Sequence, residues 1–212
     1  MREDVCICQE LEQSHAGLYT TFQPDDEFGE RTVSVLLDEK ESELVFIDHP
    51  SVEMSVENCI ATYAPHACVV VYSVTDRTSF RTASEILRYL WQEGITQEKA
   101  VILVGNKCDL ARARVISSQE GKSLACAHDC KFIETSSGIQ HNVDELLVGI
   151  LQQCRLRDAK FRKEMKALKS SKGKNKLNGS RTSLSLHLAK EILGKLCLQN
   201  SKSKSCENLH VL

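Results

Sequence analysis

The sequence predicts an α/β fold, a doubly wound and mostly parallel sheet with helices on both faces, followed by a basic C-terminal tail. Short β-branched runs alternate with helical periodicity from residue 31 onward. Two of these runs, residues 68–72 and 101–105, are almost wholly apolar, as in strands buried on both faces of a parallel sheet. With 42% apolar and 26% charged residues and only 3 Pro among 212, the composition is that of a folded protein.

The strands follow one another along the chain at intervals that leave room for helices. Residues 31–37 and 43–48 flank a charged turn and predict a β-hairpin. Two buried strands come next, at residues 68–72 and 101–105, and a shorter strand is predicted at residues 131–134.

Three helices are predicted between and after these strands. The first carries apolar residues at spacings of three and four behind the cap candidate Thr78 and ends near Gly94. The second and third cover residues 117–127 and 142–155, and the third places its apolar residues on one face. The folded core is expected to end there, so that residues 156–212 form the tail.

The net charge of −2 is a cancellation between the two ends of the chain. Residues 1–60 carry 15 acidic and 3 basic side chains, whereas residues 155–206 carry 15 basic and 3 acidic ones. Residues 170–183 have linker composition, and residues 184–196 predict a basic amphipathic helix suited to a membrane surface. A solvated basic linker is the alternative, and nucleic acid is disfavoured because the tail has too few aromatic residues to stack bases.

Ten cysteines raise the question of disulfides or metal, but no signal sequence opens the chain. We therefore expect reduced thiols and a cytoplasmic location. The pairs Cys6/Cys8 and Cys126/Cys130 lack a second pair at zinc-finger spacing, and no apolar run approaches the length of a membrane-spanning helix.

The run Asn106-Lys107-Cys108-Asp109, directly after the strand at 101–105, predicts selection of a guanine base. An aspartate accepts two hydrogen bonds from guanine, which adenine does not offer, while the asparagine links loops and the lysine stem covers the ring. A second base-contacting loop is expected at Thr135, Ser136 and Ser137, after the next strand. The competing interpretations are a solvated turn for the first run and a helix cap for the second.

Several stretches resemble the Ras-like small GTPases and, more closely, their Rad/Gem/Rem (RGK) branch. They are residues 71–80, 101–110, 131–136 with 140–143, and the ending 203–212. The resemblance covers about residues 25–155 plus the tail. It implies a Ras-like P-loop NTPase fold that binds GTP or GDP, with Asn106, Lys107, Asp109 and the 135–137 loop at the base.

The phosphate-binding part of that fold is missing from this sequence. A P-loop needs Gly, four residues, and then Gly-Lys-Ser/Thr, and no stretch of the chain fits. Gly121-Lys122-Ser123 imitates the end of the motif inside a predicted helix, where we interpret it as structural. Residues 1–24 match nothing in the family, which predicts a G domain truncated at its N-terminus with a central gap in its sheet. The alternative is that residues 5–8 form a short substitute strand.

The hydrolytic residues of the family are also altered. The resemblance aligns Asp48 with the aspartate that reaches Mg²⁺ through water, but Ser51 replaces the glycine that senses the γ-phosphate. No glutamine follows to orient an attacking water, and residues 25–27 offer no threonine for the metal. We therefore assign no catalytic residue and expect very weak GTP hydrolysis at most, with Mg²⁺ held only alongside a nucleotide.

The resemblance implies inhibition of voltage-gated calcium channels through the channel β subunit, with Arg112, Ile139 and His141 on the docking face. It also implies that the tail binds calmodulin, anionic inner-leaflet lipids and 14-3-3 adaptor proteins. Ser205, or alternatively Ser183 near Arg181, is the candidate phosphoserine for the adaptor. Cys206 is followed by six residues and is therefore not a prenylation site. The expected location is the inner face of the plasma membrane. The alternatives are a GTP-hydrolysing Ras-type switch and a cytoskeletal regulator.

Overall fold

A computed structural model describes residues 2–8, 30–48, 54–172 and 206–212. The chain divides into two compact units, and each is described by itself. The first is Met1–Arg157 together with Cys206–Leu212, and the second is Asp158–Ser205.

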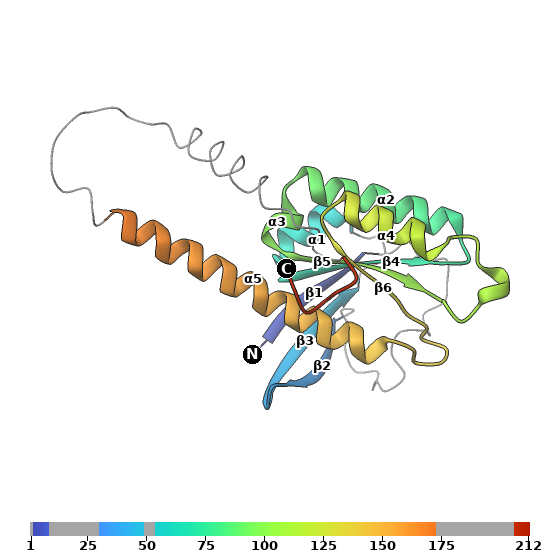
Figure 1. Ribbon diagram of the computed structural model, residues 1–212, viewed down its shortest axis with the longest axis horizontal. Coiled ribbons are helices and arrows are strands. Elements are labelled where there is room, and N and C mark those ends of the chain that lie inside the picture. The colour runs from blue at the N-terminus through green and yellow to red at the C-terminus, as the bar shows by residue number, and fades with distance from the viewer. Residues whose placement is uncertain (1, 9–29, 49–53, 173–205) are drawn as a thin grey trace. The chain divides into compact units, whose positions relative to one another are not determined.

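The first unit is built on a six-stranded sheet in the order β2-β3-β1-β4-β5-β6 (Figure 1). The β2–β3 pair is antiparallel and every other neighbouring pair is parallel. This order confirms the predicted doubly wound, mostly parallel α/β fold. The strands are β1 Arg2–Cys8, β2 Glu30–Leu37, β3 Lys40–Asp48, β4 Ala67–Ser73, β5 Ala100–Asn106 and β6 Lys131–Glu134.

The predicted gap in the centre of the sheet is absent, so this prediction is wrong: β1 lies between β3 and β4. Val5 pairs with Phe46 of β3 on one side and with Ala67 of β4 on the other. Residues 5–8 are at most 4% exposed. The physical reason is that two parallel neighbours satisfy the backbone of a short strand, while its alternating side chains enter the cores on both faces. The substitute strand at residues 5–8 is therefore confirmed, and these four residues belong to the core.

The predicted hairpin is confirmed, with a tighter turn than expected. Only Asp38 and Glu39 separate β2 from β3, and both have positive φ, at 54° and 60°. This is the backbone of the two-residue turn that matches the right-handed twist of antiparallel strands. Arg155 secures the hairpin by donating to the Ser42 hydroxyl at 3.1 Å.

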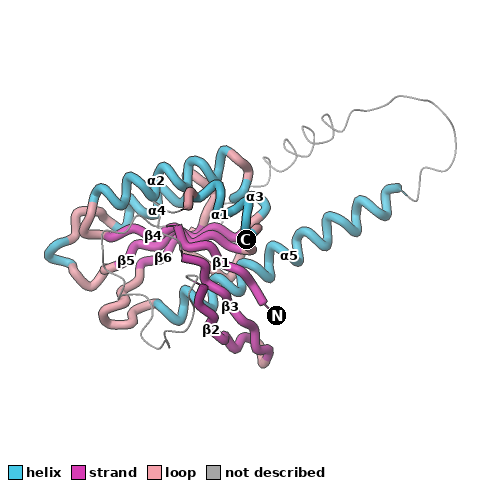
Figure 2. Tube along the Cα trace, turned by 180° about the vertical axis from the view of Figure 1, so that it is seen from behind, coloured by secondary structure: helices cyan, strands magenta, loops and turns pink. Residues whose placement is uncertain are grey.

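Helices cover both faces of the sheet (Figure 2). On one face Cys6, Val70 and Leu103 pack against residues of α1, α2 and α4, including Leu87. On the other face the apolar residues of β1, β3, β4 and β5 pack against Leu146, Ile150, Leu151 and Cys154 of α5. The helices are α1 Val56–Tyr63, α2 Arg77–Gln92, α3 Ile95–Glu98, α4 Ser118–Ala127 and α5 Val143–Lys172, with the 3-10 turn η1 Ala111–Ala113.

The helix starts follow the expected chemistry with one correction. Asp76, and not Thr78, caps α2, because its carboxylate accepts from the backbone N–H groups of Thr78 and Ser79. Ser117 caps α4 in a capping box with Glu120. The sequence patterns did not predict α1 and α3, which are only eight and four residues long.

The end of the chain returns to the first unit, which corrects the assignment of residues 156–212 to a single tail. Leu209 is 2% exposed and packs in the core beside α5. The red segment in Figure 1, Cys206–Leu212, accordingly lies along α5. The reason is that Leu209 supplies apolar surface that the core of the first unit can bury.

In the second unit the structure describes the part of α5 beyond Arg157, where residues 158–168 are all exposed. None of the helices among the described residues is both long enough and apolar enough to cross a membrane. The predicted amphipathic helix at residues 184–196 lies outside the described residues.

Candidate functional site

Two polar loops meet where β5 and β6 end. Asn106, the last residue of β5, accepts hydrogen bonds through Oδ1 from the backbone N–H of Lys107 at 2.8 Å and of Ser137 at 3.4 Å. The Thr135 hydroxyl donates to the same oxygen at 3.5 Å. Asn106 thus links the two loops, which is the role predicted for it.

The same loops are joined by three further hydrogen bonds. The backbone N–H of Cys108 donates to the Thr135 carbonyl at 3.1 Å, and the Thr135 N–H donates to the Gly105 carbonyl at 2.9 Å. The Ser136 hydroxyl donates to Asp109 Oδ1 at 2.5 Å. Ser136 is fully buried and Asp109 is exposed, so a buried side chain orients an exposed carboxylate.

The structure therefore brings all six predicted base-contacting residues into one cluster. Lys107 adopts a left-handed backbone, with φ of 63°, and its side chain is exposed beside the cluster. A carboxylate, a lysine stem and backbone groups around one exposed surface suit the flat polar edge and face of a purine. Contact with guanine stays a prediction for each of these residues.

An ion pair under the β6 loop was missed by sequence reasoning. Arg114 donates to both carboxylate oxygens of Glu134, at 2.7 and 3.1 Å. The hydrogen bond to Glu134 raises the pKa of Arg114. Asn142 Nδ2 donates to the Glu134 carbonyl at 2.8 Å, which joins the end of the loop to its beginning. The sequence shows a carboxylate ending the strand, but nothing in it identifies Arg114 as the partner.

Asp48, the predicted metal ligand, is the last residue of β3. It lies opposite Ile7 of the parallel strand β1, so it is at the same edge of the sheet as Asn106. The residues after it, including Ser51, lie outside the described residues. Its contact with Mg²⁺ stays a prediction.

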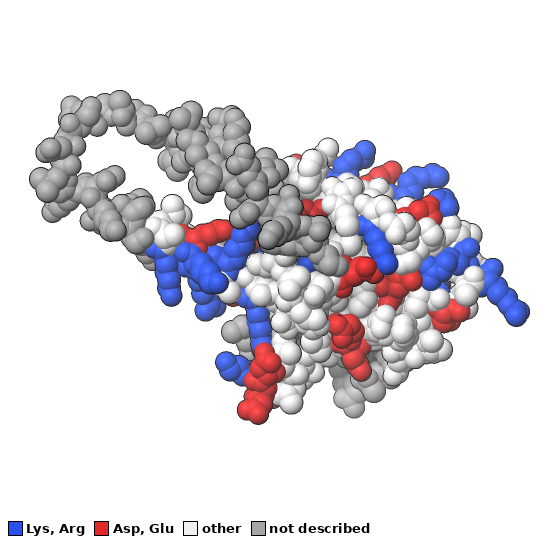
Figure 3. Space-filling view, in the orientation of Figure 1, with Lys and Arg blue, Asp and Glu red and all other residues white. Residues whose placement is uncertain are grey.

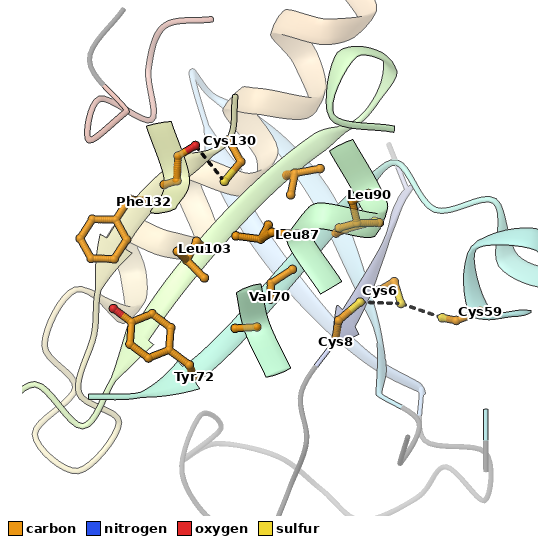
Figure 4. Close-up of a cluster of buried hydrophobic side chains, with 14 of the residues drawn as sticks. Cys6, Cys8, Cys59, Val70, Tyr72, Leu87, Leu90, Leu103, Cys130 and Phe132 are labelled. Carbon is orange, nitrogen blue, oxygen red and sulfur yellow. Dashed lines mark hydrogen bonds between the residues drawn. The ribbon is translucent and has the colours of Figure 1, made fainter. Parts of the chain in front are cut away.

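Beside Asp48, the end of β1 is apolar and rich in thiols (Figure 4). The sulfur of Cys6 lies 2.6 Å from that of Cys59 and 3.7 Å from that of Cys8. The hydrogen bond to Cys6, followed by burial, raises the pKa of Cys59. The Cys59 thiol is therefore neutral at neutral pH. In the described ranges no three His, Cys, Asp or Glu side chains are grouped so that they could hold a metal ion.

The residues present fit the base of a guanine nucleotide but not its phosphates. The sequence that joins β1 to β2 contains no Gly-x-x-x-x-Gly-Lys-Ser/Thr pattern. The imitation at residues 121–123 lies in α4, where a Cβ on Gly121 would be 2.5 Å from the Tyr72 hydroxyl and 2.6 Å from the Phe132 ring. Gly121 thus permits close packing between α4 and the sheet, and its structural interpretation is confirmed.

The three predicted docking residues occupy two neighbouring loops. Ile139 is 67% exposed and His141 is also exposed, in the loop that follows β6. His141 exchanges backbone hydrogen bonds with Ser136, at 2.9 and 3.0 Å. Arg112 is exposed in η1, three residues after Asp109. Asp109 accepts the hydrogen bond from the Ser136 hydroxyl. The remaining predicted site, Ser205, lies outside the described residues.

Comparison with known proteins shows which family and which relatives this chain is similar to. Residues 27–156 match the model of the Ras family. The human GTP-binding protein GEM is 42% identical over 153 residues, which cover 69% of this chain and 49% of that protein. The human GTP-binding protein RAD is 44% identical over 154 residues, which cover 69% and 47%.

A third relative extends the match along the chain. The human GTP-binding protein REM 1 is 37% identical over 195 residues, 86% of this chain and 61% of that protein. The chain spans about half the length of the first two relatives. The matched residues include both polar loops and α5 as far as residue 156. The chain therefore belongs to the Ras family of small GTP-binding proteins, within its Rad/Gem/Rem branch.

Proposed function

We propose that this protein is an RGK-type regulator that restrains voltage-gated calcium channels through the channel β subunit at the inner face of the plasma membrane. One observation carries the proposal. The loop that bears the exposed Ile139 and His141 is fixed to the base-binding loops through Ser136. A surface held rigid by buried hydrogen bonds suits protein recognition, because little side-chain and loop ordering is lost on binding.

Binding of the purified full chain to a purified channel β subunit tests this docking face. The double variant Arg112→Ala/His141→Ala removes two of its exposed side chains and is expected to bind about tenfold or more weakly. The matched control is Arg81→Ala/Arg88→Ala, which removes two exposed side chains of α2 and is expected to bind like the wild type. The proposal is wrong if the wild type does not bind, or if the docking variant binds as well as the control.

The nucleotide is proposed to bind weakly and through its base. The cluster around Asn106 and Asp109 supports recognition of guanine, whereas no P-loop sequence is available to wrap the phosphates. Fluorescent GDP titrated into the full chain measures this affinity. We expect it to be much weaker than micromolar, with Mg²⁺ bound only alongside the nucleotide.

The rival function, a GTP-hydrolysing Ras-type switch, is favoured by the same base-binding cluster. It predicts tight nucleotide binding and measurable phosphate release from GTP. Micromolar or tighter binding with turnover would replace our proposal. Our proposal predicts very weak hydrolysis at most, because the sequence provides no glutamine after Asp48 to orient water and no glycine at residue 51.

The tail is proposed to hold the protein at anionic lipids and to bind calmodulin. In the second unit Phe161, Met165 and Leu168 are 39–63% exposed and lie four and three residues apart, on one side of the helix. Lysines and arginines surround this stripe, and Figure 3 shows their blue side chains gathered on α5. A basic helix with one apolar stripe suits both an anionic membrane surface and calmodulin.

Flotation with vesicles tests lipid binding and calmodulin binding separately. Vesicles that contain phosphatidylserine should carry the full chain, and neutral vesicles should not. Calcium-loaded calmodulin should release it. The variant Phe161→Ser/Leu168→Ser should weaken both interactions, while Leu36→Ser, another change of an exposed apolar residue, should not. Adaptor binding through Ser205 is tested with phosphorylated protein, and Ser205→Ala should abolish it.

A further inference from the structure

The C-terminal segment, Cys206–Leu212, packs into a complementary site on the rest of the first unit, which is called its seat below. Leu209 is 2% exposed, and a Cβ on Gly149 of α5 would be 2.5 Å from its Cδ1 atom. Gln153, itself 1% exposed, donates through Nε2 to the carbonyls of Leu209 and Val211, at 2.5 and 2.8 Å. The absence of a Cβ at Gly149 thus leaves room for the Leu209 side chain, and the buried amide of Gln153 binds the backbone of the segment.

Three more contacts hold the segment along its length. The Phe132 N–H on β6 donates to the Cys206 carbonyl at 2.8 Å. Glu207 pairs with Lys122 of α4 at 2.7 Å, and His210 Nε2 lies 3.1 Å from Glu145 Oε1 of α5. The segment is therefore fixed to α4, β6 and α5 together, and Cys206 has one defined position.

This position places the Cys206 thiol beside the turn of α4 that carries Cys126. The sulfur of Cys206 lies 3.9 Å from the carbonyl oxygen of Lys122, and Cys126 is one helical turn further along α4, over that carbonyl. Burial, followed by the side-chain interaction with Cys126, raises the pKa of Cys206 to about 11. Cys126 is exposed and Cys206 is partly exposed, so the pair is open to small molecules.

Exposure distinguishes this pair from the other close thiols of the chain. The sulfurs of Cys6 and Cys59 lie 2.6 Å apart, but these residues are only 1% and 4% exposed. A dissolved oxidant reaches Cys126 before it reaches that core pair.

We propose that Cys126 and Cys206 form a reversible disulfide that locks the C-terminal segment onto the first unit. The oxidant class is a low-molecular-weight disulfide such as glutathione disulfide. The Cys126 thiolate attacks one glutathione sulfur, and a glutathione thiolate leaves. The Cys206 thiolate then attacks the mixed disulfide at the Cys126 sulfur, and the second glutathione leaves. The two protein thiols lose two electrons and two protons, and two reduced glutathione molecules form.

The modification is independent of nucleotide and of the channel. In a reducing compartment an exposed disulfide is transient and therefore regulatory. Closing it converts a segment held by non-covalent contacts into one that cannot detach. The residues between α4 and Cys206, which include the whole second unit, then form a closed loop.

The test exposes the full chain to graded ratios of oxidised to reduced glutathione, blocks free thiols with N-ethylmaleimide, and maps disulfides by non-reducing peptide mass spectrometry. We expect a Cys126–Cys206 link to form at milder ratios than any other protein disulfide. Hydrogen exchange of the amides of residues 207–212 should slow in the linked form and recover with dithiothreitol. Capture of Cys206 by glutathione alone, or earlier formation of Cys6–Cys59, would overturn the proposal.

Three variants separate the pair from its surroundings. Cys126→Ser should abolish the link, while Cys108→Ser, at a partly exposed thiol of the base loop, should leave it unchanged. Leu209→Ala retains both thiols but removes the side chain that packs beside Gly149. It should reduce link formation about tenfold, because Cys206 on a detached segment has a lower effective concentration at Cys126 than Cys206 on a bound segment. Equal linking in Leu209→Ala and wild type would show that the seat does not position the pair.

Discussion

The carboxyl ends of β1 and of β5 and β6 lie at one edge of the same sheet, yet they carry opposite chemistry. After β5 and β6, polar loops are linked through Asn106, Thr135 and Ser136 around the exposed Asp109. At the end of β1, Cys6 and Cys8 are buried against Cys59, and no phosphate-loop sequence follows. The difference teaches that a central strand of a parallel sheet can be held by pairing and packing alone, with no phosphate-loop pattern in the sequence after it.

The largest expected effect tests whether β1 is a true core strand. Ile7→Ala removes a side chain that is 4% exposed and should lower the free energy of unfolding by about 2–5 kcal/mol. Leu36→Ala, at a side chain that is 72% exposed, should change it by less than about 0.5 kcal/mol. Denaturant unfolding of both variants measures the contrast. Equal stability of the two would remove β1 from the core and restore the central gap.

The next effect tests the polar side of the comparison. Asp109→Asn removes the charge that is predicted to accept from guanine and should weaken GDP binding about 100-fold, since hydrogen bonds to charged groups contribute about 1.5–3 kcal/mol each. Asp129→Asn is the control, because Asp129 is exposed outside both loops and its left-handed backbone, with φ of 53°, accepts Asn. Titration with fluorescent GDP measures both variants. Unchanged affinity in Asp109→Asn would mean that the loops do not select guanine.

Alkaline pH should weaken the side of the sheet that is rich in thiols. Burial raises the pKa of Cys68 above its ordinary value of 9.0. Below pH 9 this thiol is neutral in both the folded and the unfolded chain. Above pH 9 the unfolded chain loses its proton first, so stability falls with rising pH by about 1.4 kcal/mol per pH unit for each such thiol.

Unfolding of wild type and Cys68→Ala between pH 8 and 11 checks this dependence. The variant should start less stable, because it loses a buried sulfur, but its stability should fall less steeply above pH 9. Parallel slopes for the two proteins would contradict the assignment to Cys68.

The smallest effect concerns the hydrogen bond that orients Asp109. Ser136→Ala leaves the chain fold intact but removes the hydroxyl that donates to Asp109 Oδ1, and should cost about 1 kcal/mol of stability. Nucleotide affinity should fall less than in Asp109→Asn, because the carboxylate remains. Ser123→Ala, at an exposed position of α4, is the control. A larger loss of affinity in Ser136→Ala than in Asp109→Asn would reverse the roles given to the two residues.

Much of the fold was predictable because its signals are local. The hairpin and the apolar strands at 67–73 and 100–106 were found from β-branched runs. The run at residues 106–109 could be proposed as a base-binding loop because its four residues are contiguous and follow a strand. The central position of β1 was predicted only as the alternative, because seven residues with no following glycine loop give a weak local signal. The pairing of Arg114 with Glu134 was missed for a related reason, since it joins residues far apart in sequence.

The sequence by itself determined the family, the absence of a phosphate-loop pattern and the opposite charges of the two ends of the chain, because composition and contiguous motifs carry these properties. Only the tertiary structure decided that β1 completes the sheet and that Leu209 enters the core beside Gly149. It alone also decided that the Cys206 sulfur lies 3.9 Å from the carbonyl oxygen of Lys122, one helical turn before Cys126. The physical reason is that burial and pairing between distant residues depend on which surfaces the folded chain brings together, and no local pattern specifies that.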